Sequence, residues 1–180
     1  MVNGLTLSRI PATLLFNLNI IYCRNRLFIC SLIFILIATS DILDGKLARH
    51  YKVTSRLGSI LDVAADFFFI FSASFLLNMQ KMLSLSLVIL IVFKFSEFCF
   101  TSYLISGRFN HRKPLVFDKI GRVVAVFLYM LPLFTIFLHT FFRRNSANLI
   151  LFYTFLILTA LSMISIYQRA IKIIQYRLEV

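Results

Sequence analysis

The chain has 180 residues, of which 60% are hydrophobic, and it contains 21 Phe. Apolar residues make up roughly half of an ordinary soluble domain. A mean hydropathy of +0.89 therefore excludes such a domain and predicts an integral membrane protein. The formal net charge of +12 does not indicate a nucleic-acid-binding protein, because the basic residues stand singly at the ends of apolar runs and form no dense stripe.

A helix needs about 20 mostly apolar residues to cross the hydrocarbon core of a bilayer. Six segments meet or approach this requirement, namely 8–23, 27–45, 58–78, 82–106, 117–140 and 147–168. The first is the weakest, because Arg9 and Pro11 interrupt it, and its leading part NGLTLSRI is compatible with a short interfacial helix. No repeat or long linker divides the chain, so we expect residues 1–180 to form one all-helical membrane domain with six transmembrane helices.

The basic residues predict the orientation of these helices. Thirteen Lys and Arg fall at one set of segment ends, five fall at the opposite set, and Lys94 lies inside the fourth segment. Cytoplasmic loops carry the excess of Lys and Arg in membrane proteins. Both termini are therefore expected in the cytoplasm, and the membrane is expected to be the inner or plasma membrane of the cell.

Carboxylates are concentrated in residues 41–66, DILDGKLARHYKVTSRLGSILDVAAD. This stretch holds four of the seven Asp and Glu residues of the chain, which are Asp41, Asp44, Asp62 and Asp66. On a helix, Asp41 shares a face with the residues at i+3, i+4 and i+7, and Gly58, Asp62 and Asp66 form a second stripe at intervals of four. Two antiparallel helices joined by a short turn would direct all four carboxylates into one cleft that opens toward the cytoplasm.

Like charges in a low-dielectric cleft repel one another and need a positive partner. The cations that are near in sequence lie at or beyond the helix ends; they are Lys46, Arg49, Lys52 and Arg56. Hard divalent cations suit such a site better, because Mg²⁺ and Mn²⁺ prefer carboxylate oxygens and two such ions can clamp a diphosphate. Buried ion pairs or a proton path are the alternatives for any single Asp, but neither needs the small residues Gly45 and Ala48 on the same stripe.

The spacing of these residues resembles a known signature. The pattern D-x2-D-G-x2-A-R-x8-G-x3-D-x3-D, which runs from Asp41 to Asp66, resembles without substitution the signature of the CDP-alcohol phosphatidyltransferases. The resemblance implies a reaction in which an alcohol hydroxyl attacks the β-phosphorus of CDP-diacylglycerol and CMP leaves. It also implies that Asp41, Asp44 and Asp62 hold two Mg²⁺ or Mn²⁺ ions, and that Asp66 contributes to the metal site and is the general base.

The resemblance further implies which residues bind the CDP-lipid and how the protein assembles. Gly45 would admit the nucleotide and Arg49 would pair with the diphosphate, while Ser55 and Thr6 would contact the CDP moiety. A homodimer is expected from the family alone. Arg49 presents a planar fork of donors that suits phosphate oxygens, in agreement with its implied role.

The acceptor alcohol is less clearly indicated. The run KFSEFCFTSYLISGR, followed by DKIGR, resembles a segment of the phosphatidylglycerophosphate synthases, although Ser96 stands where an Arg would precede Glu97. Glycerol 3-phosphate is therefore the expected acceptor, with phosphatidylglycerol, as in cardiolipin synthase, or inositol phosphate as alternatives. Its candidate contacts are basic residues of the loop 106–122, namely Arg108, Lys119 and Arg122. Lys94, inside the fourth segment, lies one turn from Glu97, so it either pairs with Glu97 or contacts the substrate.

Two other functions are compatible with buried acids in a membrane. An intramembrane prenyltransferase also uses acidic pairs with Mg²⁺, but its two acidic motifs usually lie far apart in sequence. A cation or proton transporter uses buried acids as a transport site, but the Gly-x2-Ala-Arg element beside the acids has no purpose there.

Overall fold

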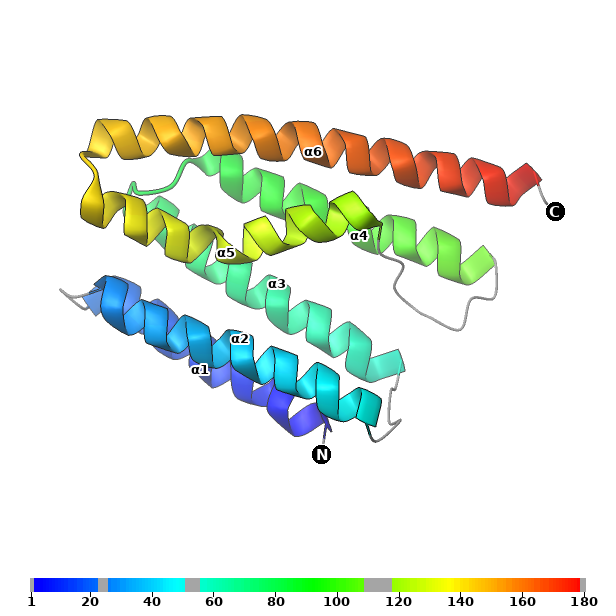
Figure 1. Ribbon diagram of the computed structural model, residues 1–180, viewed down its shortest axis with the longest axis horizontal. Coiled ribbons are helices and arrows are strands. Elements are labelled where there is room, and N and C mark those ends of the chain that lie inside the picture. The colour runs from blue at the N-terminus through cyan, green and yellow to red at the C-terminus, as the bar shows by residue number, and fades with distance from the viewer. Residues whose placement is uncertain (1, 23–25, 51–55, 109–117, 179–180) are drawn as a thin grey trace.

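The computed structural model of the chain describes residues 2–22, 26–50, 56–108 and 118–178 (Figure 1). Within these ranges, the side chains of residues 2–8, 26, 41–50, 56–57, 105–108, 172–173 and 175–178 lie outside the description. The described residues form helices and no strand. The helices are α1 (Val2–Tyr22), α2 (Arg26–His50), α3 (Arg56–Met79), α4 (Leu85–Arg108), α5 (Lys119–Phe141) and α6 (Arg144–Leu178). The predicted all-helical fold is confirmed.

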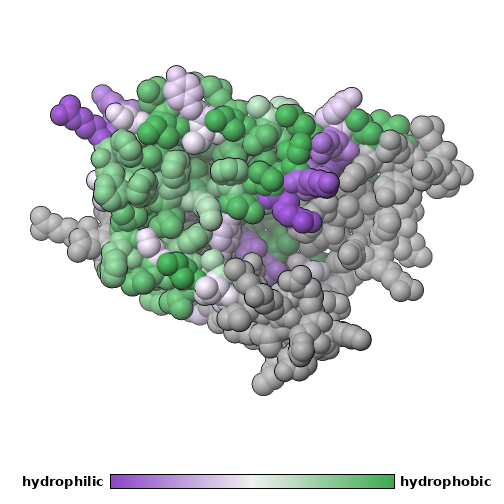
Figure 2. Space-filling view, viewed as in Figure 1, coloured by the Kyte–Doolittle hydropathy of each residue, from purple (hydrophilic) through white to green (hydrophobic). Residues whose placement is uncertain are grey.

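Most of the helices are long and apolar enough to cross a membrane. Within the described residues this holds for Gly58–Met79, Leu85–Leu104, Lys119–Phe141 and Arg144–Ile171, and α2 contributes a shorter apolar stretch, Leu27–Ser40. The surface is apolar over most of the coloured part of Figure 2, and side chains such as Phe28, Leu36 and Phe100 are at least 64% exposed. Such a surface is stable against lipid and not against water. The chain is therefore an integral membrane protein, while the crossings of α1 and α2 stay predictions.

The first helix is continuous. The sequence allowed its leading part to be a separate interfacial helix, but α1 runs from Val2 to Tyr22 with Pro11 inside it. Proline removes one helix hydrogen bond, and membrane helices tolerate this where neighbouring helices surround the site. Here α1 packs against both α2 and α3.

Successive helices run in opposite directions along the bundle. Three of them therefore begin, and three end, at the same end of the bundle. At the right of Figure 1, α1, α3 and α5 begin, and α2, α4 and α6 end. We call this the site end of the bundle, because the described parts of the acidic stretch, residues 41–50 and 56–66, lie there. The turn of residues 80–84 between α3 and α4 lies at the opposite end, where the Asn78 side-chain amide donates to the Leu83 carbonyl at 2.9 Å.

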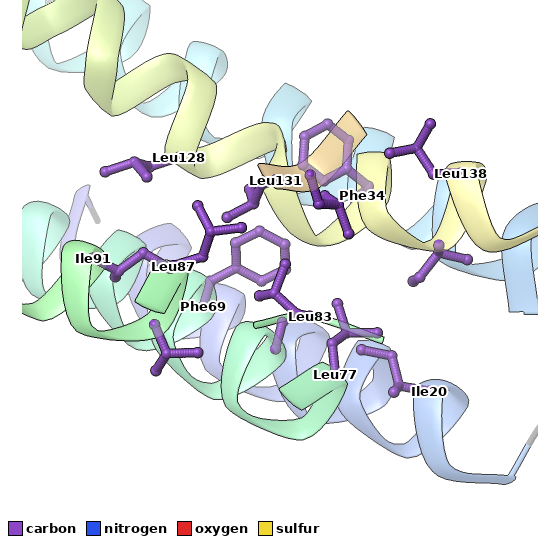
Figure 3. Packing of buried hydrophobic residues seen from close by; sticks show 14 of the residues in the cluster. Ile20, Phe34, Phe69, Leu77, Leu83, Leu87, Ile91, Leu128, Leu131 and Leu138 are labelled. Atoms are coloured by element: carbon purple, nitrogen blue, oxygen red, sulfur yellow. The ribbon is translucent and has the colours of Figure 1, made fainter. Parts of the chain in front are cut away.

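Helix α3 lies at the centre of the bundle and packs against α1, α4 and α5. Phe69, which is 1% exposed, occupies the middle of the core (Figure 3). Its ring centroid lies 5.2 Å from that of Phe16 and 5.2 Å from that of Tyr129, and the Phe34 ring lies 5.4 Å from Tyr129. Because these rings belong to α1, α2, α3 and α5, they hold α3 in a fixed place relative to three neighbouring helices.

Candidate active site

Two of the four predicted carboxylates are described at the site end of the bundle. Asp62 and Asp66 lie one turn apart near the start of α3, and their side chains are 42% and 32% exposed. A carboxylate that keeps a third of its surface open within an apolar bundle remains accessible to a ligand. We call Asp62 and Asp66 the acidic pair.

A buried arginine from the first helix joins the acidic pair. The Arg9 side chain is 2% exposed, and its Nη2 donates to Asp62 Oδ1 at 2.6 Å while its Nη1 donates to Asp66 Oδ1 at 3.1 Å. Both carboxylates thus face the same group, as the predicted stripe at i and i+4 requires. The sequence had assigned Arg9 only to the membrane topology, because 53 residues separate it from the nearer acid.

The remaining residues of the signature lie outside the described side chains. The backbone of α2 is helical through the positions of Asp41, Asp44, Gly45 and Arg49, and α1 is helical at Thr6. Ser55 lies outside the described residues. Helix α2 ends at His50 and α3 begins at Arg56, so a short connection brings the two acidic segments to the same end of the bundle (Figure 1). Whether all four carboxylates face one another stays a prediction.

The chemistry of the acidic pair fits a hard divalent cation. Carboxylate oxygens are preferred ligands of Mg²⁺ and Mn²⁺, and the acidic pair already binds one cation, the Arg9 guanidinium. Among the described side chains no three His, Cys, Asp or Glu gather at metal-binding distance. Since Asp41 and Asp44 lie outside that part of the chain, the acidic pair is the half of the predicted metal site whose geometry is visible.

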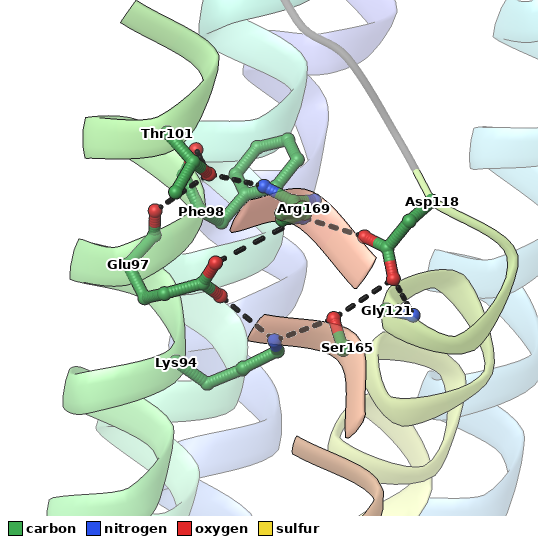
Figure 4. Close-up of polar contacts among 8 residues, drawn as sticks. All are labelled: Lys94, Glu97, Phe98, Thr101, Asp118, Gly121, Ser165 and Arg169. Atoms are coloured by element: carbon green, nitrogen blue, oxygen red, sulfur yellow. Dashed lines mark hydrogen bonds and ion pairs between the residues drawn. The ribbon is translucent and has the colours of Figure 1, made fainter. Parts of the chain in front are cut away.

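A second group of polar residues is buried between α4, α5 and α6 (Figure 4). We call it the α4–α6 polar cluster; it consists of Lys94, Glu97, Thr101, Asp118, Ser165 and Arg169. Lys94 Nζ lies 2.7 Å from Glu97 Oε2, so of the two roles that the sequence allowed for Lys94 the structure has the pairing, and Lys94 also donates to Ser165 Oγ at 2.9 Å. Buried polar groups cost less free energy when they satisfy one another in this way.

Arg169 connects the three helices of this cluster. Its Nε donates to Asp118 Oδ1 at 2.6 Å and lies 3.8 Å from Glu97 Oε1, and its Nη1 donates to the Thr101 hydroxyl. The guanidinium carbon also lies 4.9 Å from the centre of the Phe98 ring. Arg169 is 3% exposed, so the charged network holds α4, α5 and α6 together within the protein interior.

Asp118 is the N-cap of α5. Its Oδ2 accepts hydrogen bonds from the Gly121 amide at 2.6 Å and from the Ser165 hydroxyl at 2.8 Å. Burial alone would raise the pKa of this carboxyl group, but hydrogen bonds from Arg169, Gly121 and Ser165 and the charge of Arg169 outweigh burial and hold the pKa below its ordinary value. The carboxylate thus fixes the point from which Lys119 and Arg122 project, and both of these candidate acceptor contacts are exposed.

A small cavity joins the two polar groups. It has a volume of about 160 Å³, and its lining includes Asp66 of the acidic pair, Lys94 and Arg169 of the polar cluster, and Gly121 at the start of α5. The rest of the lining is largely apolar, including Phe67, Phe95 and Tyr129. Asp66 therefore faces a space that admits a small molecule, with two buried cations on its lining.

Sequence reasoning missed Arg9, Asp118, Ser165 and Arg169 as parts of this region. The sequence contains one signal that points to Arg9 and Arg169 as functional residues. Each is a charged residue within or beside a predicted apolar segment, where charges are rare and usually functional. Their partners could not be predicted, because no spacing rule links residues on helices that meet only in the folded bundle. Arg108 lies on α4, but its side chain is outside the described residues.

Comparison with known proteins identifies the family. The sequence model of the CDP-alcohol phosphatidyltransferase family matches residues 1–166. The chain belongs to this family. Membership of this family leaves no support for the prenyltransferase and transporter alternatives.

Three curated relatives share short segments with this chain. Each is named CDP-diacylglycerol--glycerol-3-phosphate 3-phosphatidyltransferase. The protein of Sodalis glossinidius is 54% identical over 37 residues, that of Pectobacterium atrosepticum 50% over 38 residues, and that of Blochmanniella floridana 44% over 50 residues. The matched segments cover 21–28% of this chain and 20–26% of the relatives.

Proposed function

We propose that this protein transfers a phosphatidyl group from CDP-diacylglycerol to glycerol 3-phosphate, with release of CMP, in phospholipid biosynthesis. The observation that carries the proposal is the intact eight-residue signature from Asp41 to Asp66 in a chain that matches the family over residues 1–166. The names of the three relatives favour glycerol 3-phosphate as the acceptor.

Asp66 is the proposed general base. An alcohol is a poor nucleophile at neutral pH and needs a carboxylate within hydrogen-bond reach, and Asp66 lines the cavity in which an acceptor would lie. The acceptor oxygen bonds to the β-phosphorus while its proton passes to the Asp66 carboxylate. The bond from the β-phosphorus to the oxygen that bridges the two phosphates breaks, and that oxygen leaves as part of CMP.

Asp41, Asp44, Asp62 and Asp66 would hold the divalent ions, which we propose to be two Mg²⁺ or Mn²⁺. When bound, such ions polarise the diphosphate and offset its charge. The protein's own contribution is to orient the donor. Gly45 leaves room for the nucleotide, Arg49 pairs with the diphosphate, and Ser55 and Thr6 contact the CDP moiety, in roles that the resemblance to the family implies.

The size and charge of the cavity support a small phosphorylated acceptor. A volume of about 160 Å³ suits a three-carbon alcohol better than a second phospholipid. Lys119 and Arg122 are exposed on the first turn of α5, next to Gly121, which lines the cavity. With Arg108, they are the proposed contacts of the acceptor phosphate. Phosphatidylglycerol and inositol phosphate are the alternative acceptors.

The excess of Lys and Arg at the site end favours a cytoplasmic location for that end and for both termini, in the inner or plasma membrane. A homodimer is proposed from the family alone. Cytoplasmic access is consistent with the proposed chemistry, since glycerol 3-phosphate is charged and does not cross the bilayer core.

The test is CMP release by the purified protein in detergent with CDP-diacylglycerol and Mg²⁺, measured with a panel of acceptors. We expect CMP release with glycerol 3-phosphate and little with glycerol, inositol or serine. Faster release with phosphatidylglycerol or inositol phosphate would overturn the acceptor assignment. No release with any acceptor, or release that does not depend on a divalent metal, would overturn the proposed function itself.

A further inference from the structure

Arg9 occupies an unusual position for an arginine in a membrane protein. It is 2% exposed, yet each of the two carboxylates that it contacts is at least 32% exposed. The two terminal nitrogens are divided between the acids, because Nη2 lies 2.6 Å from Asp62 Oδ1 and Nη1 lies 3.1 Å from Asp66 Oδ1. The planar guanidinium fork thus binds both members of the acidic pair at once.

We propose that Arg9 is a positioning residue for the acidic pair, holding Asp62 and Asp66 in the metal-free protein and making metal binding depend on an arriving diphosphate. The inference deepens the proposed function, on which it depends for the identity of the diphosphate. Its first part, competition between Arg9 and a divalent cation for the acidic pair, is tested by metal binding alone and does not require the transfer reaction.

The physical basis is the fixed charge of the guanidinium. Arginine stays protonated at every relevant pH, so it offsets part of the repulsion between the two carboxylates. A divalent ion that binds the same carboxylates must approach this positive charge in a region of low dielectric, where charges repel strongly. Arg9 therefore stabilises the acidic pair without metal and lowers the affinity of the acidic pair for metal.

A diphosphate changes this balance. Its negative charges attract both the divalent ion and Arg9, so the metal binds more tightly once the diphosphate is present. Because coupling between two ligands is reciprocal, the metal must raise the affinity for the diphosphate by the same factor. The site then fills with metal and donor together and holds little metal on its own.

A purely structural ion pair has different surroundings in this protein. Arg169 is as buried as Arg9, at 3% exposure of its side chain, but its partner Asp118 is 2% exposed, so both charges are enclosed. The partners of Arg9 are open to ligands on the side that Arg9 does not cover. Because Arg169 lines the same cavity as Asp66, the control is Arg143, an exposed arginine between α5 and α6 at the opposite end of the bundle.

The test is binding of Mn²⁺ to the purified protein in detergent, followed by electron paramagnetic resonance, first without any nucleotide. We expect Arg9→Gln to bind Mn²⁺ more tightly than the wild type, on the order of tenfold. Arg9→Lys, which keeps the charge, should stay close to the wild type, and so should the control Arg143→Gln. Adding CDP-diacylglycerol should tighten Mn²⁺ binding strongly in the wild type and much less in Arg9→Gln.

Equal or weaker Mn²⁺ binding by Arg9→Gln would overturn the proposal, as would equally tight binding by Arg9→Gln and Arg9→Lys. If Arg9→Gln does not fold, the wild type decides, because tight stoichiometric Mn²⁺ binding without nucleotide contradicts competition by Arg9. A tighter Mn²⁺ affinity in Arg9→Gln together with no CMP release from the wild type would support the role of Arg9 and overturn only the proposed function.

Discussion

Asp118 shows how one carboxylate connects three helices. It caps α5 through the Gly121 amide, accepts a hydrogen bond from Ser165 of α6, and pairs with Arg169 of α6, which in turn reaches Glu97 and Thr101 of α4. Breaking a buried pair by removing one charge costs more free energy than the pair contributes, because the remaining charge stays buried. A single ionised side chain thus links the start of α5 to α6 directly and to α4 through Arg169.

The variant Asp118→Asn removes the negative charge but keeps the helix cap, because asparagine also caps helices well. We expect it to destabilise the protein by roughly 3 kcal/mol at pH 7, measured as a lower unfolding temperature in detergent. Ser96→Ala, on the exposed face of α4, is the control and should change the unfolding temperature little.

The effect of Asp118→Asn should depend on pH in a defined direction. The folded-state pKa of Asp118 lies below its ordinary value, so its contribution is complete above the unfolded pKa of about 3.9 and is lost as the pH falls through the lower folded-state pKa. The difference in unfolding temperature between the wild type and Asp118→Asn should therefore persist at pH 5 and shrink only in stronger acid. A difference that is independent of pH down to the acid limit of folding contradicts this account.

At the scale of residues, sequence spacing predicts contacts within one helix and not between helices. The interval of four between Asp62 and Asp66 places both carboxylates on one stripe, and the structure has them on the same guanidinium. Lys94 and Glu97, three positions apart, pair for the same reason. From the sequence, Arg9 and Arg169 are only charges at segment ends, because their partners lie on other parts of the bundle at least 51 positions away.

Helix α3 is the element on which the candidate site depends. It carries Asp62 and Asp66 at its start, and its middle is held by the aromatic contacts of Phe69 with Phe16 and Tyr129. The neighbouring Phe68 faces outward and is 41% exposed, whereas Phe69 is 1% exposed. Adjacent phenylalanines on one helix thus have opposite roles, one in the core and one on the surface that contacts lipid.

This difference gives a matched pair of variants. Phe69→Ala removes a buried ring and should destabilise the protein by about 3–5 kcal/mol, whereas Phe68→Ala should have a small effect because lipid replaces the lost contacts. Unfolding temperatures in the same detergent measure both. If the two variants are destabilised equally, the assignment of Phe69 to the core and of Phe68 to the lipid-facing surface is wrong.

The number and order of the helices followed from hydropathy, but their lengths did not. The last segment was expected at 147–168, whereas α6 extends from Arg144 to Leu178. Apolar windows end where polar residues begin, and a helix needs no apolar residues once it leaves the hydrocarbon core. The additional residues matter, since Arg169 of the α4–α6 polar cluster lies just beyond the expected end.

At the scale of the whole molecule, the charged side chains that the structure describes as buried lie toward the site end of an apolar bundle. The acidic pair and the α4–α6 polar cluster share the cavity of about 160 Å³ that both Asp66 and Arg169 line. Composition predicted the membrane, and the signature predicted the family that the match over residues 1–166 shows. The cavity itself was not predictable, because its lining comes from α3, α4, α5 and α6.

The central claim is that Asp66 serves phosphatidyl transfer at this end of the bundle. The most direct test compares CMP release from CDP-diacylglycerol, with Mg²⁺ and glycerol 3-phosphate, by the wild type, by Asp66→Asn and by the control Glu179→Gln, which removes one carboxylate near the C-terminus. We predict release by the wild type and the control, and a rate lower by about 10²-fold or more in Asp66→Asn, as expected for loss of a general base. An Asp66→Asn variant that releases CMP as fast as the wild type would contradict the account.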